Sequence, residues 1–179
     1  MAFTVFITGA SSGIGAALAQ EYAQKGAVVG LVGRRREVLE DVRARMNHTE
    51  NHEIYAADVT VETELHDAAR AFIAKHGAPD VVIAAAGISV GTWTEYYEDL
   101  AHIRRVFETN VFAMASTFHP FIAPMKAAKK GALVGIASVA GIRGLPGSEA
   151  YCASKAAVIS YCESLRGELR GTGVRVVTL

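Results

Sequence analysis

Short β-branched runs alternate with longer helical patterns along the whole chain. The expected strands are residues 3–8, 28–32, 53–58, 80–85, 132–138 and 174–179. The expected helices between them are residues 13–25, 35–46, 62–76, about 98–128 and 151–170. Alternating strands and helices form right-handed βαβ units around a parallel sheet, and strands that are apolar throughout indicate burial on both faces. The pattern therefore predicts an α/β, doubly wound parallel sheet.

The length and composition fit one domain over residues 1–179. Basic and acidic side chains are equal in number, 18 of each, so nothing in the charge favours nucleic acid as a partner. The most apolar long stretch, 111–125, contains Ser116, His119 and Pro120, and it does not resemble a membrane span. The six histidines show no ligand spacing, so no metal site is expected.

The two cysteines, Cys152 and Cys162, are expected on one helix. Ten residues of helix separate them by about 15 Å, which is too far for a disulfide. Free thiols suit a reducing compartment, and the N-terminal sequence lacks the features of a signal peptide. A cytoplasmic location is expected, with Cys152 as a small packing residue.

The sequence TGASSGIG, residues 8–15, joins the first expected strand to the first expected helix. Its glycines, Gly9, Gly13 and Gly15, allow positive φ and a close approach of the backbone to a ligand. The N–H groups and the macrodipole at a helix start favour an anion. Glycine loops often form only tight turns, but the strand–loop–helix context favours the pyrophosphate cradle of a Rossmann domain.

The second expected strand ends in the sequence LVGRRR. In dinucleotide-binding folds, an acidic residue here binds the ribose diol of NAD, whereas an arginine accommodates the extra phosphate of NADP. Gly33 stands where the acid is expected, and Arg34 follows it with a planar fork of donors suited to phosphate. Arg34, Arg35 and Arg36 could instead be solvated charges at a helix start. The missing acid favours NADP over NAD.

The sequence YCASK places Tyr151 and Lys155 one helical turn apart, on one helix face. Ser138 lies thirteen positions before Tyr151, at the end of an expected strand. Ligands of open α/β sheets bind beyond the carboxyl ends of the strands. Ser138 and the first turn of the Tyr151 helix are therefore expected to meet near a cofactor.

At this point the sequence resembles the short-chain dehydrogenase/reductase family over its whole length. The matching stretches are TGASSGIG, AADVT, AAAG, ETNVFA, IASVAG and YCASK, in an order and spacing that are highly specific. The resemblance implies a Rossmann sheet, for which we predict the strand order 3-2-1-4-5-6. It implies an NAD(P)-dependent enzyme that interconverts a carbonyl and a secondary alcohol. It also implies a homodimer or homotetramer, in which the helix near 111–121 and the Tyr151 helix pack across a two-fold axis.

The resemblance assigns roles to individual residues. The implied cofactor-binding residues are Gly9, Ser11, Ser12, Gly13, Ile14, Gly15, Arg34, Asp58, Val59, Ala85, Gly87, Tyr151 and Lys155. The implied catalytic residues are Asn110, Ser138, Tyr151 and Lys155. Asp58 and Val59 are expected beside the adenine, and Asn110 is expected to anchor a water that relays protons to Lys155.

The implied chemistry explains these residue types. Carbonyl reduction requires a hydride to carbon and a proton to oxygen, and the nicotinamide supplies the hydride. A phenol ordinarily loses its proton near pH 10, and a neighbouring ammonium stabilises the phenolate. Lys155 would therefore adapt Tyr151 to acid–base work nearer the working pH. Lys155 would also bind the nicotinamide ribose, and Ser138 would orient the substrate oxygen.

The sequence departs from the family pattern in two places. Ala85 stands where the family has an asparagine that braces the central strand beside the cofactor. The chain also ends at Leu179, before the Pro-Gly turn, lid helices and seventh strand that the family normally has. The resemblance therefore implies one NAD(P)-binding Rossmann domain that is truncated at its C-terminus. A nucleotide-binding module without turnover, acting as a sensor or assembly subunit, is therefore the alternative to an enzyme.

Two segments of the sequence each allow two interpretations. The segment 89–97 carries Trp93, Tyr96 and Tyr97, which could form a wall of a substrate pocket or only pack a loop. The helix pattern at 111–121 is apolar nearly all round, which fits either the core or a face buried against a partner. The substrate itself cannot be read from the sequence.

Overall fold

The computed structural model describes residues 2–179. Its six strands form one parallel sheet in the order β3-β2-β1-β4-β5-β6. They are β1 (Thr4–Thr8), β2 (Val28–Gly33), β3 (Glu53–Ala56), β4 (Val81–Ala84), β5 (Ala132–Gly135) and β6 (Arg175–Thr178). The predicted fold class and strand order are confirmed.

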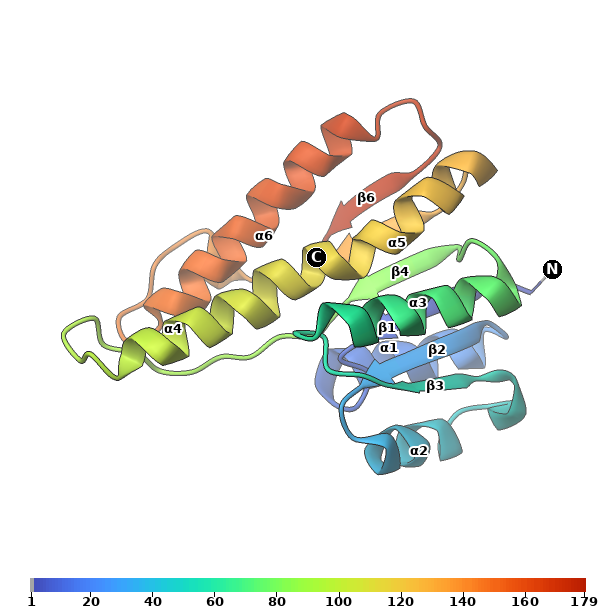
Figure 1. The fold of residues 1–179 in the computed structure, drawn as a ribbon, viewed down its shortest axis with the longest axis horizontal. Coiled ribbons are helices and arrows are strands. Elements are labelled where there is room, and N and C mark those ends of the chain that lie inside the picture. The colour runs from blue at the N-terminus through green and yellow to red at the C-terminus, as the bar shows by residue number, and fades with distance from the viewer. Residues whose placement is uncertain (1) are drawn as a thin grey trace.

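Six α-helices and three short turns of helix join the strands (Figure 1). The α-helices are α1 (Gly13–Gln24), α2 (Arg36–Ala44), α3 (Glu62–His76), α4 (Asp99–Phe107), α5 (Ala113–Ala128) and α6 (Glu149–Glu168). The short turns are the 3₁₀ turns η1 (Thr49–Asn51) and η3 (Val139–Gly141) and the π turn η2 (Glu108–Phe112). The helix expected over 98–128 is therefore α4, η2 and α5, which run on as one long helix in Figure 1.

Two expected strands end earlier than predicted, because polar side chains form local turns there. After β3, Asp58 accepts hydrogen bonds from the backbone N–H and the hydroxyl of Thr60, at 2.9 and 2.7 Å. After β5, Ser138 Oγ accepts a hydrogen bond from the N–H of Ala140 at 3.2 Å and begins η3. Asp and Ser commonly form such turns with the backbone two residues on. Both turns lengthen the loops at the carboxyl edge of the sheet, where the candidate site lies.

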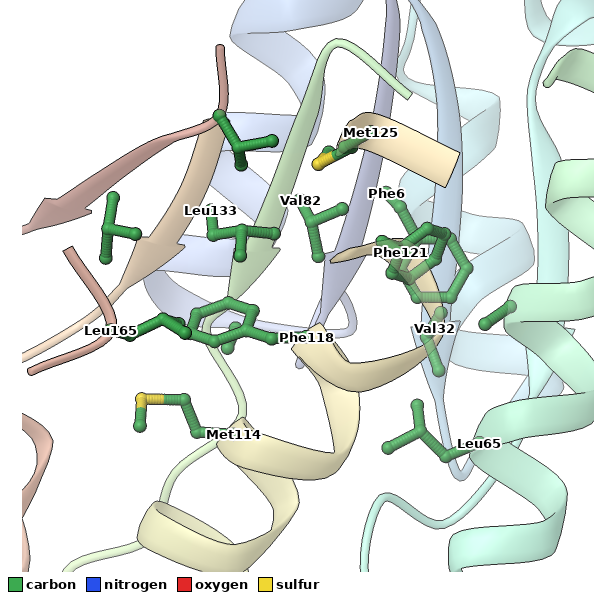
Figure 2. Close-up of a cluster of buried hydrophobic side chains, with 14 of the residues drawn as sticks. Phe6, Val32, Leu65, Val82, Met114, Phe118, Phe121, Met125, Leu133 and Leu165 are labelled. Atoms are coloured by element: carbon green, nitrogen blue, oxygen red, sulfur yellow. The ribbon is translucent and has the colours of Figure 1, made fainter. Parts of the chain in front are cut away.

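Helices cover both faces of the sheet. One core lies between the sheet and α3, α5 and α6, and Figure 2 shows its large side chains, including Phe6, Phe118, Phe121 and Leu133. These four side chains are fully buried. The second core is built from smaller residues between the sheet and α1 and α2. The apolar pattern at 111–121 is thus mostly core, although Phe112 is 67% exposed.

Within residues 2–179, no helix combines the length and the apolar character needed to cross a bilayer. Both cysteines are free and buried in α6. Cys152 therefore occupies a packing position, as expected.

Candidate active site

A cavity of about 770 Å³ lies at the carboxyl edge of the sheet. All of the residues that the resemblance implies for the cofactor contribute to its lining. These are Gly9, Ser11, Ser12, Gly13, Ile14, Gly15, Arg34, Asp58, Val59, Ala85, Gly87, Tyr151 and Lys155. The first loop, the ends of β2 to β5 and the start of α6 therefore face one common space.

The first turn packs so closely that glycine is required in it. Gly9 has φ +69°, and a Cβ there would lie 2.6 Å from the backbone nitrogen of Ala86 in the loop after β4. A Cβ on Gly15 would lie 2.3 Å from the carbonyl oxygen of Gly9. Real Cβ atoms do not approach backbone so closely, so both positions exclude a side chain.

The start of α1 is open toward the cavity. Gly13 has φ +53°, and a Cβ there would meet nothing within 4 Å. Ser12 precedes the helix without a side-chain capping hydrogen bond, so the first N–H groups of α1 are not satisfied by a cap. This arrangement suits a phosphate, because the N–H groups and the helix dipole favour an anion at that point.

Positive charge gathers at the β2 and β3 end of the cavity. Arg34 Nη1 lies 4.0 Å from Asp58 Oδ2, and Arg35 and Arg105 also line the cavity. Burial alone would raise the pKa of the Asp58 carboxyl. The hydrogen bonds from Thr60 and the charges of Arg34 and Arg105 outweigh burial and lower that pKa. Asp58 therefore stays ionised and draws two arginines toward the same end of the cavity.

Tyr151 and Lys155 lie in the first turns of α6, at the opposite end of the cavity lining. The Lys155 ammonium lies 5.6 Å from the centroid of the Tyr151 ring and donates a hydrogen bond of 2.7 Å to the carbonyl of Ile136. Lys155 is only 6% exposed, and burial lowers its pKa below the usual value. Gly141 makes this packing possible, since a Cβ there would lie 2.7 Å from the carbonyl carbon of Lys155.

Asn110 lies in the π turn η2 and is 2% exposed. Its amide forms a two-point clamp on the backbone of Ile88. Oδ1 accepts from the Ile88 N–H at 2.8 Å, and Nδ2 donates to the Ile88 carbonyl at 3.0 Å. Asn110 is therefore behind the lining and supports the loop that forms it, and π turns often occur at functional positions of this kind.

Ser138 follows β5 by three residues and is half-buried, but it does not contribute to the cavity lining. Its Oγ accepts the Ala140 N–H, so its own O–H remains available as a donor. The structure therefore places Tyr151 and Lys155 together in the cavity lining, whereas Ser138 lies outside that lining.

The sequence reasoning missed several residues. Arg35 is in the quoted LVGRRR stretch, and it lines the cavity beside Arg34. Arg105 and Thr109 reach the cavity from α4 and η2, and no local pattern identifies them. Ser154 is inside YCASK, fully buried, and bonded to Asn110 at 2.9 Å. The sequence could have indicated Ser154, because it is a polar residue directly before Lys155 on a helix that packs against the sheet.

The aromatic segment 89–97 does not line this cavity beyond Ser89. Trp93 and Tyr96 are half-exposed and Tyr97 is 83% exposed. The segment is tied to the loop before α6, because Thr92 N donates to the Gly147 carbonyl at 3.2 Å and Thr92 Oγ1 donates to Glu149 at 3.1 Å. Among residues 2–179, no cluster of His, Cys, Asp or Glu has the makeup of a metal site.

Comparison with known proteins identifies the family. Residues 3–179 match the family model described as short chain dehydrogenase. The chain belongs to the short-chain dehydrogenase family. Its parallel six-stranded sheet with flanking helices is the fold expected of a member of that family.

Among curated relatives, an uncharacterized oxidoreductase of Myxococcus xanthus is 40% identical over 98% of this chain and 70% of its own length. The 11-beta-hydroxysteroid dehydrogenase-like 4A of Arabidopsis thaliana is 36% identical, over 97% of this chain and 58% of its own. The NADPH-dependent pterin aldehyde reductase of the same plant is 33% identical, over 98% and 72%. The chain thus spans between about half and three quarters of the length of these relatives.

Solved structures give the same family. A short-chain dehydrogenase from Streptomyces avermitilis has a TM-score of 0.91 at 32% identity, covering 99% of this chain and 64% of that one. A metagenomic short-chain oxidoreductase in complex with NADP has a TM-score of 0.89 at 30% identity, covering 98% and 79%. The family binds NAD or NADP, and the second structure contains NADP.

The close packing at Gly9 yields a prediction about stability. Gly9→Ala should lower the free energy of unfolding by roughly 2–4 kcal/mol, because it adds left-handed strain and a clash with the Ala86 backbone. Gly144→Ala is the matched control, since a Cβ there meets nothing within 4 Å. It should change stability by less than about 0.5 kcal/mol. Urea unfolding of both variants measures the difference, and equal effects would contradict the close approach.

Proposed function

We propose that residues 1–179 form a single NADP-binding domain of an oxidoreductase that interconverts a carbonyl and a secondary alcohol. The observation that carries the proposal is that Tyr151 and Lys155 share one cavity lining with the glycine turn and Arg34. A phenol beside a buried ammonium is a means of moving a proton, and a glycine turn at a helix start is a means of holding phosphates.

The residues present fit a dinucleotide. Gly13 leaves open space at the start of α1 for the phosphates, and Asp58 and Val59 line the other side for the adenosine. Gly87 lines the cavity without a side chain, at a point close to Asn110 and Lys155. When bound there, the nicotinamide supplies or accepts the hydride.

The proton chemistry falls to the chain's own side chains. In the reducing direction, the Tyr151 hydroxyl donates its proton to the substrate oxygen as that oxygen gains charge. The Lys155 ammonium stabilises the phenolate that is left, and its hydrogen bond to Ile136 fixes its position. The free O–H of Ser138 donates a second hydrogen bond to the same oxygen. Oxidation of an alcohol is the same sequence in reverse.

Preference for NADP rests on the end of β2. Gly33 provides no carboxylate for a ribose diol, and Arg34 and Arg35 follow it in the cavity lining. Arg34 is 66% exposed and keeps only a 4.0 Å contact with Asp58, so its guanidinium is available for a 2′-phosphate. The NADP complex of one structural neighbour and the name of the pterin aldehyde reductase support the same preference.

A nucleotide-binding module with little turnover is the competing function, and one observation favours it. Ala85 lacks the bracing amide of the family. Within residues 2–179, the buried hydroxyl of Thr8, which pairs with Ala84 in the sheet register, has no hydrogen-bond partner. The end of β1 therefore carries a buried hydroxyl that Ala85, without an amide, does not satisfy. Cofactor binding without turnover on a broad panel of aldehydes and ketones would favour the module.

We also propose that the protein works in the reducing cytoplasm, in keeping with two free cysteines, and that it forms a homodimer. A groove of about 500 Å³ runs between α3, α5 and α6. Apolar side chains in it include Phe112 and Tyr161, and its charged or titratable groups include His66, His119 and three glutamates. A second copy of this chain, related by a two-fold axis, would set histidines against glutamates and cover the exposed Phe112.

Phe112→Ser should therefore shift the protein from dimer to monomer in light scattering, because it removes an exposed ring from the groove. Leu100→Ser, at another exposed apolar site on α4, should leave the mass unchanged. A monomeric native protein, or a dimer that tolerates Phe112→Ser, would count against this face.

The acid–base role gives a second prediction. Tyr151→Phe should reduce kcat by about 10²–10⁴-fold and change the Kd for NADPH by less than about twofold, because only the transferable proton is lost. Tyr22→Phe, on α1 and outside both the cavity lining and the groove, is the matched control and should retain turnover. Comparable kcat in Tyr151→Phe and the native protein would show that another acid acts.

The cofactor preference gives a third. Arg34→Ala should weaken NADPH binding by roughly 1–3 kcal/mol, the scale of a charge-assisted contact, and leave NADH nearly unchanged. Arg36→Ala, two residues further on and outside the cavity lining, is the control. Titration of both cofactors measures the effect. Equal losses for NADPH and NADH would mean that Arg34 does not read the 2′-phosphate.

A further inference from the structure

A series of buried hydrogen bonds links the loop after β4 to the helix that carries Tyr151. Its central member is Ser154, which is fully buried in α6. The Ser154 hydroxyl donates to the carbonyl of Tyr151 at 2.7 Å and accepts from Asn110 Nδ2 at 2.9 Å. A serine inside a helix often bonds only to the preceding turn. The second bond, to a residue 44 positions away, requires a further explanation.

Each polar hydrogen in this series of hydrogen bonds has one acceptor. The Tyr151 carbonyl can only accept, so the single hydroxyl hydrogen of Ser154 goes to it. The Ser154 oxygen must then accept, which requires the nitrogen side of the Asn110 amide to face it. Nδ2 thus divides its two hydrogens between Ser154 and the Ile88 carbonyl, and Oδ1 accepts from the Ile88 N–H. All of these donors are satisfied only while the Ser154 hydroxyl is present.

The series of hydrogen bonds reaches the cavity at Gly87 and Ile88, and both residues line it. A Cβ on Gly87 would lie 3.3 Å from Asn110 Oδ1 and 3.7 Å from Lys155 Nζ. The amide oxygen and the ammonium therefore approach the same side of Gly87. Without Ser154, Asn110 would still clamp Ile88, but the clamp would have no polar bond to α6. Groups that act on one substrate must keep their separation closely, since small misplacements slow a reaction strongly.

We propose that Ser154 is a positioning residue of this site. Its hydroxyl locks the Asn110–Ile88 loop to the helical turn that carries Tyr151 and Lys155. The distance between the cofactor-facing loop and the proton-donating phenol is thereby fixed. The proposal deepens the oxidoreductase function above and rests on it for its effect on turnover, but not for its effect on structure.

The structural arm of the test is hydrogen exchange in the native protein without cofactor, read at the Ile88 amide. Ser154→Ala leaves a buried Asn110 N–H without an acceptor, so the clamp should loosen and Ile88 should exchange about tenfold faster. Ser154→Thr keeps a hydroxyl and should retain most of the protection. Ser160→Ala, an exposed serine on the same helix, should have no effect. If Ser154→Ala does not fold, the near-isosteric Ser154→Cys takes its place.

The kinetic arm is a double-mutant cycle with Ser154→Ala and Asn110→Ala. Ser154→Ala should lower kcat about tenfold with little change in KM, and the double variant should be no slower than Asn110→Ala alone. Unchanged exchange at Ile88, or kcat effects that simply add, would overturn the proposal. A native protein that turns over no carbonyl would refute the proposed oxidoreductase function, while the exchange result would still decide the role of Ser154.

Discussion

The structure depends on the contact between the first turn and the loop after β4. Gly9 brings these two backbones closer than any side chain would allow, and Gly15 packs on Gly9 in the same way. β1 and β4 are neighbours at the point where the strand order reverses, which is where an open α/β sheet binds its ligand. The close contact at Gly9 therefore fixes the two loops that line this part of the cavity.

At and behind the opposite end of the cavity lie polar groups that a folded chain normally keeps in water. Lys155, Asn110 and Ser154 are all buried, and burial lowers the Lys155 pKa. Each of them is satisfied by a backbone carbonyl or by another member of the group. Buried polar networks rigidify a site when every member is satisfied. Burying these polar groups therefore offsets part of the stability that the large aromatic core provides.

The sequence predicts what local pattern and topology determine. The parallel sheet, the glycine turn and the Tyr151–Lys155 pair follow from periodicity, spacing and the carboxyl-edge rule, and the structure agrees with them. The sequence does not predict that Asn110 clamps Ile88, that Ser154 joins that clamp to α6, or that the charge of Arg105 lowers the Asp58 pKa. These interactions join residues 22 to 47 positions apart and depend on how α4 and α6 sit on the sheet. Early strand ends were missed because Asp58 and Ser138 form turns with their own neighbours.

A crystal structure with NADPH would show whether one dinucleotide spans the cavity from the glycine turn to the Tyr151–Lys155 pair. We expect phosphates at the N–H groups beside Gly13, the 2′-phosphate near Arg34, and the nicotinamide ribose within hydrogen-bond reach of Lys155 Nζ. A nicotinamide that lies away from Tyr151 and Lys155, or phosphates bound away from the start of α1, would contradict this expectation.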